Sequence, residues 1–136
     1  MRETVLLINF QDAKQLREIK MILLSMKIKM KTVEKKDYLQ KIGYLAGLKD
    51  MEAVQEVYDG EELEKEVMIF ANLREAQLEQ ILYRIRKNGV KKVDYKAILT
   101  DTNKDWNVPQ LYEELAGEHE KMKKIMYNSR LLYYNR

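Results

Sequence analysis

Val5-Leu6-Leu7-Ile8-Asn9-Phe10 opens the first of two similar segments that decide the fold. A helical pattern follows it, and then an alternating strand pattern from Ile28. The second segment begins with Val67-Met68-Ile69-Phe70-Ala71, continues through another helical pattern and ends in a strand at 93–99. Two such units predict an α+β fold of the ferredoxin-like type. This is a split βαβ sandwich in which helices cover one face of a four-stranded antiparallel sheet.

Apolar residues at spacings of three and four predict the two crossover helices. The first runs from about Ala13 to Met26, with Asp12 in the N-cap position. The second ends at Asn88-Gly89, a typical C-terminal cap. After the first helix, lysines at positions 27, 29 and 31 alternate with less polar residues. A strand with three lysines on one side is expected at an edge of the sheet.

The chain is expected to form a single domain over residues 1–136, with an added C-terminal helix. We assign residues 1–36 to the first βαβ half, 37–66 to a long crossover, 67–100 to the second half and 107–133 to the helix. The strands at 5–8 and 67–71 are apolar on both faces, so both faces of the sheet must be covered. The C-terminal helix is the candidate for the second face.

The composition excludes several classes of site. The chain has 136 residues, no cysteine and one histidine. Disulfides, iron-sulfur clusters and cysteine zinc sites are therefore excluded. His119 lies five residues from Glu114, a spacing that does not support a metal site. We expect no metal and no cofactor, and we find no serine in the setting of a hydrolase nucleophile.

The cellular setting predicted by the sequence is the cytoplasm. No stretch approaches the roughly 18 apolar residues of a membrane-spanning helix. The first apolar run lacks the basic lead-in of an export signal. A membrane partner is therefore not expected.

The C-terminal helix is too long for its own domain. An unbroken helix from Pro109 to Leu132 would measure about 36 Å, whereas a four-stranded sheet is about 15 to 20 Å wide. Part of it should project, which predicts a homodimer formed through this helix. The expected interface residues are Leu115, Met122, Met126, Leu132 and Tyr133.

A polar loop follows the last predicted strand and gives the candidate ligand site. Its residues are Thr100, Thr102, Asn103 and Trp106, close to the start of the C-terminal helix. Such groups beside a helix N-terminus suit a small anionic metabolite. The alternative is structural: the polar groups make local turn hydrogen bonds, and Trp106 packs beside the core. The structural interpretation is the one that we favour.

Nucleic acid is an unlikely partner. RNA-recognition domains share the expected scaffold, and Phe10 and Phe70 lie on candidate central strands. The glycine and aromatic signature of those domains is missing, however, and the C-terminal helix would cover the face that RNA needs. RNA binding ranks below a role in protein interaction.

The stretch Tyr95-Lys96-Ala97-Ile98-Leu99-Thr100, followed by Thr102-Asn103, Trp106 and Leu111-Tyr112-Glu113-Glu114-Leu115, resembles the bacterial family called domain of unknown function 3783. The earlier segments Gly43-Tyr44-Leu45-Ala46-Gly47 and Glu61-Glu62-Leu63 are similar to it as well. Members often have a proline where this chain has Asp101. The resemblance implies a compact bacterial domain and assigns no activity, cofactor or substrate.

The leading hypothesis is a non-enzymatic binding or assembly module that acts through its C-terminal helix. The alternative is a sensor of a small anionic metabolite that uses the loop at 100–109. An RNA-binding domain is the third possibility.

Overall fold

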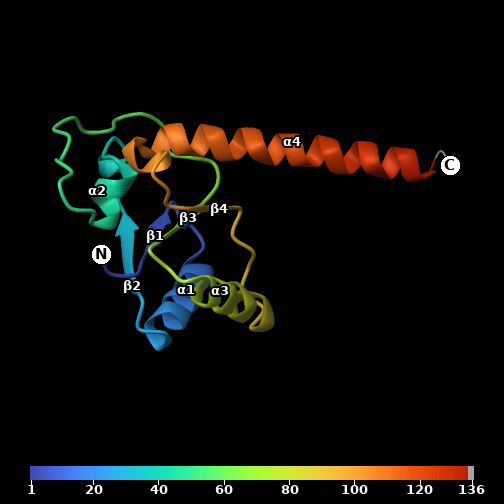
Figure 1. Ribbon diagram of the computed structural model, residues 1–136, viewed down its shortest axis with the longest axis horizontal. Helices are drawn as coiled ribbons and strands as arrows, with labels where there is room; N and C mark the ends of the chain where they lie inside the picture. The colour runs from blue at the N-terminus through green and yellow to red at the C-terminus, as the bar shows by residue number, and fades with distance from the viewer. Residues whose placement is uncertain (135–136) are drawn as a thin grey trace.

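The computed structural model describes the backbone of residues 1–134 and the side chains of residues 1–124. A four-stranded sheet lies between two layers of helix, and one long helix extends away from them (Figure 1). The strands are β1 (Thr4–Ile8), β2 (Lys29–Val33), β3 (Val67–Ala71) and β4 (Tyr95–Ile98). The α-helices are α1 (Ala13–Ser25), α2 (Ile42–Ala46), α3 (Glu75–Lys87) and α4 (Val108–Tyr134), and two single 3₁₀ turns are η1 (Lys35–Asp37) and η2 (Asn103–Asp105).

The sheet is mixed, which corrects the predicted antiparallel arrangement. Its strand order is β2-β1-β3-β4. β1 pairs with β2 in parallel, β3 pairs with β4 in parallel, and only the central pair β1 and β3 is antiparallel. Each βαβ unit therefore joins neighbouring strands, so the two units lie side by side and do not interleave.

The antiparallel prediction was wrong because burial patterns distinguish only central strands from edge strands. In the interleaved arrangement β1 and β3 are central as well, and β2 and β4 are again at the edges. Exchanging the two edge strands changes every outer pair from antiparallel to parallel without changing which residues are buried. All five residues of β1 and of β3 are buried, as either arrangement requires. The predicted edge position of the lysine-rich strand β2 is confirmed.

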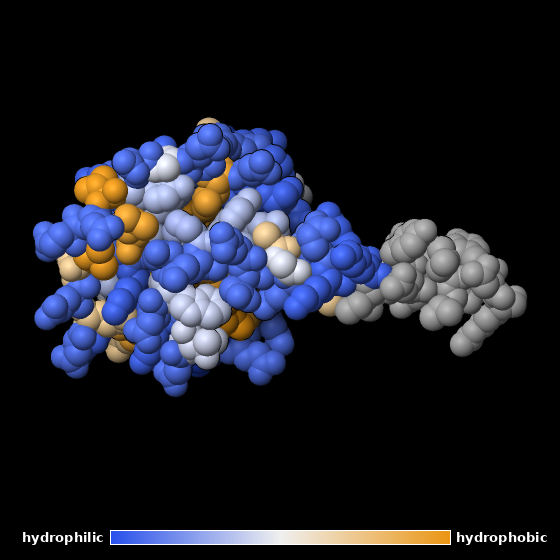
Figure 2. All heavy atoms as spheres, turned by 90° about the horizontal axis from the view of Figure 1, so that it is seen from above, coloured by the Kyte–Doolittle hydropathy of each residue, from blue (hydrophilic) through white to orange (hydrophobic). Residues whose placement is uncertain are grey.

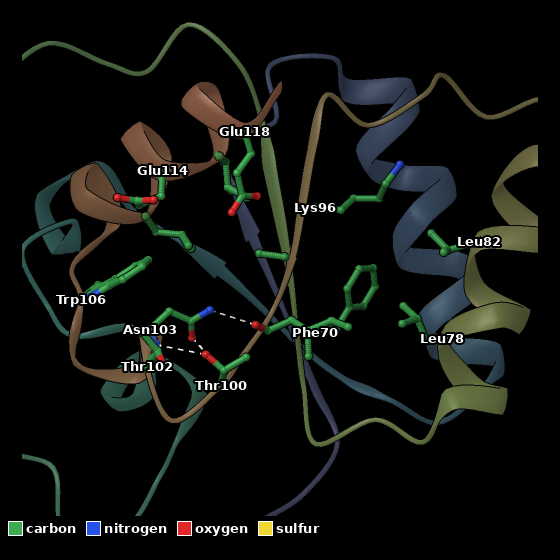
Figure 3. A pocket seen from close by; sticks show the side chains of 14 residues that line it. Phe70, Leu78, Leu82, Lys96, Thr100, Thr102, Asn103, Trp106, Glu114 and Glu118 are labelled. Carbon is green, nitrogen blue, oxygen red and sulfur yellow. Dashed lines mark hydrogen bonds between the residues drawn. The ribbon is translucent and has the colours of Figure 1, made fainter. Parts of the chain in front are cut away.

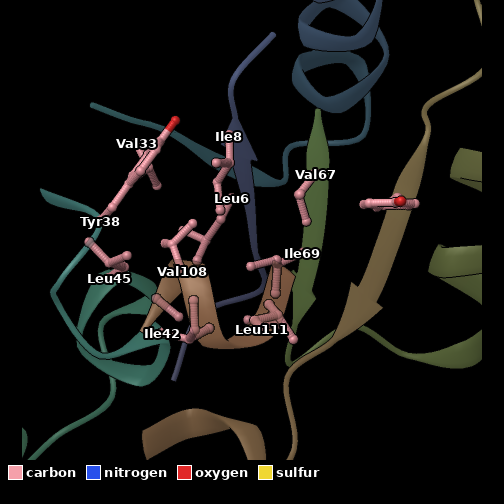
Figure 4. Close-up of a cluster of buried hydrophobic side chains, with 13 residues drawn as sticks. Leu6, Ile8, Val33, Tyr38, Ile42, Leu45, Val67, Ile69, Val108 and Leu111 are labelled. Atoms are coloured by element: carbon pink, nitrogen blue, oxygen red, sulfur yellow. The ribbon is translucent and has the colours of Figure 1, made fainter. Parts of the chain in front are cut away.

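Each face of the sheet carries its own apolar core. Val5 and Leu7 of β1 face α1 and α3, where they meet Ile19, Leu23 and Ile81. The opposite face is covered by α2 and by the start of α4 (Figure 4). The prediction that both faces are covered is thus confirmed.

Several backbone details repeat in the two halves. Asn9 follows β1 with φ 59°, and Asn72 follows β3 with φ 61°. Both take the left-handed conformation, which asparagine tolerates better than most residues. Lys27 (φ 57°) and Gly89 (φ 67°) occupy equivalent left-handed positions after α1 and α3. An approximate two-fold axis at the antiparallel pair of β1 and β3 therefore relates the two similar βαβ units.

The crossover between the halves is anchored by polar side chains. It contains α2, as the predicted turn or short helix, and runs without helix or strand from residue 47 to 66. The Gln40 side chain donates to the Val54 carbonyl and accepts from the Val54 N–H, both at 2.7 Å. The Tyr38 hydroxyl donates to Glu62 Oε1 at 2.7 Å. These contacts hold an irregular segment against the core.

Helix α4 begins in the core and then leaves it. Val108 and Leu111 are buried in the cluster shown in Figure 4, and Leu115 and Ala116 are partly buried against it. From Gly117 to Lys124 every side chain is exposed. The helix passes through Gly117 without a break. Among the residues described, no helix has the length and apolar character needed to cross a membrane.

Candidate functional site

The loop after β4 is built by its own side chains. Asn103 N–H donates to Thr100 Oγ1 at 3.1 Å, while Thr100 N–H donates to Asn103 Oδ1 at 2.8 Å. Asn103 Nδ2 also donates to the carbonyl of Ile98 at 2.9 Å. The polar groups of Thr100 and Asn103 are therefore engaged in shaping the loop.

Trp106 and Asn107 connect this loop to the neighbouring helices. The Trp106 carbonyl accepts a hydrogen bond from Ile42 N–H at 2.8 Å, and its half-buried indole packs on the core. Asn107 Oδ1 accepts from Gln110 N–H at 3.0 Å, and Gln110 Oε1 accepts from Asn107 N–H at 2.9 Å. This reciprocal cap fixes the start of α4.

A pocket of about 540 Å³ lies along the outer edge of β4 (Figure 3). One wall comes from α4 and the loop, and the other comes from α3 and β3. The four predicted ligand residues Thr100, Thr102, Asn103 and Trp106 all line it. The structure thus brings the predicted residues to one pocket, although two of the four are occupied by local hydrogen bonds.

The charges of the pocket were not anticipated. Glu114 and Glu118 project from α4 on one side, and Lys96 lies on the other side of β4 (Figure 3). Burial, and to a smaller extent the charge of Lys92, lowers the pKa of the Lys96 ammonium. Two carboxylates at one wall disfavour an anion and favour a cationic group.

The apolar lining of the pocket was also missed by sequence reasoning. It includes Phe70 of β3, Leu78 and Leu82 of α3 and Ile98 of β4, whose side chain is 56% exposed. The alternation of residues 95–98 was a usable signal, because it sets Lys96 and Ile98 on one face and Tyr95 and Ala97 on the other. What the sequence lacked was evidence that β4 pairs with β3, which places it beside Phe70 and α3.

The arrangement offers no catalytic constellation. Within the described part of the chain, no group of three metal-ligating side chains is placed to hold an ion. His119 is exposed, with its ring 5.6 Å from that of Tyr95.

The predicted interface residues fall into two sets. Leu115 packs against the core and lines the pocket, while Met122 is 57% exposed on the projecting part of α4. The side chains of Met126, Leu132 and Tyr133 lie outside the described residues.

Comparison with known proteins finds a family match over part of the chain. Residues 66–122 match the family described as a domain of unknown function (DUF3783), which confirms the resemblance over these residues. Every residue that lines the pocket falls inside the matched segment, whereas residues 43–47 and 61–63 lie outside it. No curated protein and no solved structure matches the chain.

Proposed function

We propose that this chain, whose residues 66–122 belong to a family without an assigned activity, is a non-enzymatic cytosolic assembly module that pairs with a second copy of itself through α4. The observation that supports this proposal most strongly is that the helix projects beyond the domain. α4 has 27 residues and is therefore about 40 Å long, but its apolar packing on the core ends at Ala116, with a ring contact from His119 to Tyr95 beyond it.

A helix of this kind needs a partner to be stable in water. Helical segments gain most of their stability from packing an apolar face, and short isolated helices are marginal. Met122 continues the line of Leu111 and Leu115 at spacings of four and seven residues. The part of α4 just outside the domain is hydrophilic on the face turned away from the sheet (Figure 2). Together these observations support an amphipathic arm with one face available for pairing.

The charge pattern of the arm supports a second copy as that partner. Glu118 and Glu120 are followed by Lys121, Lys123 and Lys124. Because each helix carries both signs, two copies can approach without the uniform repulsion of a single-sign surface. Of the five apolar positions predicted at the interface, we propose this role for Met122, Met126, Leu132 and Tyr133, whereas Leu115 packs on the core and lines the pocket.

The pocket supports a protein partner better than a small anion. Thr100 and Asn103 already bind each other and the backbone of the loop. Glu114 and Glu118 would repel an anionic group in the remaining space. We therefore do not propose a small anionic metabolite as the ligand of this pocket.

The test is the oligomeric state of the full chain in solution. Light scattering at micromolar concentration should give twice the mass of one chain. Met122→Gln preserves helix propensity and removes an exposed apolar contact, so it should shift the equilibrium toward the monomer. Lys121→Gln is the matched control on an adjacent position and should leave the dimer intact.

A monomeric wild-type chain would contradict the proposal. Equal dissociation of the Met122→Gln and Lys121→Gln variants would also contradict it, because the apolar stripe would then have no special role.

A further inference from the structure

β4 presents an open backbone edge to the pocket. Tyr95 N–H donates to the Glu66 carbonyl and Leu99 N–H donates to the Phe70 carbonyl, so these residues face β3. Backbone groups alternate in direction along a strand, which turns the N–H and C=O of Lys96 and Ile98 away from β3. No strand of the described chain occupies that side.

Asn103 shows that this edge accepts strand-like hydrogen bonds. Its carboxamide donates to the outward carbonyl of Ile98 and accepts from Thr100 N–H. This is the pair of bonds that the N–H and C=O of one residue in an added parallel strand would make. The side chain therefore stands in for a fifth strand at the last position of β4. The outward groups of Lys96 and the N–H of Ile98 lie immediately before it.

The two walls differ in chemistry. On the α4 side, Glu114 and Glu118 project from the helix (Figure 3), and Leu115 lines the same pocket. On the α3 side, Phe70, Leu78 and Leu82 present apolar groups. Side chains of an added strand would point alternately to these two walls.

We propose that the outer edge of β4 binds an extended polypeptide segment as a fifth strand, with basic side chains on its α4 side alternating with apolar side chains on its α3 side. Lysine or arginine suits the first wall, since its aliphatic stem covers Leu115 while its charge reaches Glu114 and Glu118. Main-chain hydrogen bonds to Lys96 and Ile98 supply the docking, and the two walls supply the selectivity. This binding is independent of the α4 pair.

A second copy of the chain fits this edge less well. If the β4 strands of two copies paired around a two-fold axis, both Lys96 side chains would lie on the same face of the joined sheet. Like charges close together across strands are destabilising. The basic partner strand avoids this contact because it places its cations on the opposite face, beside the carboxylates.

The binding test uses a fluorescein-labelled peptide of alternating lysine and valine with blocked ends, titrated with the full chain at moderate salt. Fluorescence anisotropy should show saturable binding. A peptide in which glutamate replaces lysine should bind about tenfold more weakly or worse. A lysine and valine peptide with N-methylated amides keeps its side chains but loses its backbone donors, so it should not bind.

The matched variants of the protein are Ile98→Pro and Ile98→Val. Proline removes the outward N–H of Ile98, which no bond of the sheet uses, so an edge strand tolerates it. Ile98→Pro should retain the circular dichroism spectrum of the wild type and lose peptide binding, whereas Ile98→Val should keep both. Amide hydrogen exchange in Ile98→Val should slow at Lys96 on peptide binding, because that N–H becomes hydrogen bonded.

Several outcomes would overturn the proposal. These are absence of binding by the lysine peptide, equal binding of the glutamate peptide, binding of the N-methylated peptide, or unchanged binding by a folded Ile98→Pro. A wild-type dimer that dissociates in Ile98→Pro would assign the edge to a second copy instead. Met122→Gln separates the two proposals, since it should weaken the α4 pair and leave peptide affinity unchanged.

Discussion

At the residue scale, buried amide side chains take the place of missing secondary structure. Asn9 Nδ2 donates to the Leu63 carbonyl, and Gln15 Nε2 donates to the Lys91 carbonyl at 2.9 Å. Gln40 and Asn103 make the double contacts described above, with Val54 and with the edge of β4. Each of these four side chains is buried and holds an irregular segment whose backbone has few regular partners. Amide groups suit this task because they carry both a donor and an acceptor.

Replacing Asn103 by alanine should destabilise the fold. The change leaves the Ile98 carbonyl and Thr100 N–H without their intramolecular partner, so we expect a loss of about 1 to 3 kcal/mol in the free energy of unfolding. Urea unfolding measures this loss. Thr102→Ala, at an exposed position of the same loop, should change the stability by less than about 0.5 kcal/mol. If the two variants were equally stable, Asn103 would not hold the loop.

Asp94 should make stability depend on pH in the unusual direction for a carboxylate. Burial raises its pKa, and the neighbouring Glu66 raises it further. A raised pKa in the folded state means that its contribution is present at low pH and is lost as the pH rises through that pKa. Asp94→Asn should therefore be more stable than the wild type at pH 7, and this gain should shrink toward pH 3.

Urea unfolding at the two pH values provides the measurement for Asp94. Thr102→Ala is the control, because it removes no titratable group from an exposed position and should show no such pH-dependent gain. A gain in Asp94→Asn that was equal at both pH values would rule out the ionisation of Asp94 as its cause.

At the element scale, the two crossover helices end in the same way. Ile28 N–H donates to the Leu23 carbonyl after α1, and Val90 N–H donates to the Ile85 carbonyl after α3. In both caps the preceding residue is left-handed, and α3 uses Gly89 where α1 uses Lys27. Glycine takes this conformation without the penalty that a side chain brings.

The same substitution should have opposite effects at two glycines. A Cβ at Gly89 or at Gly117 would meet no atom within 4 Å, so the backbone conformation alone decides whether alanine stabilises or destabilises the fold. Gly89→Ala should destabilise by about 1 kcal/mol because φ is positive there. Gly117→Ala should stabilise by up to about 1 kcal/mol because it lies inside a helix. Thermal unfolding of both variants would show the difference, and a shift of equal sign would contradict the assigned conformations.

The sequence predicted the elements better than their neighbours in the sheet. The helical spacing after Asp12 and the apolar strands at 5–8 and 67–71 depend on local patterns, and the structure has elements at those positions. Pairing between strands depends on which edge β2 and β4 occupy, and no residue pattern in either strand specifies that choice. For the same reason the loop residues Thr100 and Asn103 could be selected, but their partner at Ile98 and the carboxylates of α4 could not.

At the scale of the whole molecule, most of the core contacts lie outside the projecting part of α4. The contacts that bury the second face come from α2, the crossover and α4 up to Ala116. From Gly117 to Lys124 the residues are exposed, although the ring of His119 lies against that of Tyr95. The sheet and its two layers therefore provide the fold, and association between molecules is the role that we propose for the projecting part of α4.

A chain that ends after Glu120 should remain folded and monomeric. Its melting temperature should not depend on protein concentration, whereas that of the full chain should rise with concentration because association stabilises the folded state. Circular dichroism melts over a range of concentrations would test this. An unfolded truncated chain would mean that residues after 120 also stabilise the domain.

The seam between β1 and β3 has one more consequence. It is a contact between two different βαβ units of one polypeptide, so each unit offers the other unit of a neighbouring molecule the same surface. The segment at 47–66, which lacks helix and strand, is the hinge about which such an exchange of halves would occur. At high concentration two chains could thus exchange βαβ units and form an intertwined dimer. Such a dimer would use the existing contact between β1 and β3, now made between two chains, and would need no new contact surface.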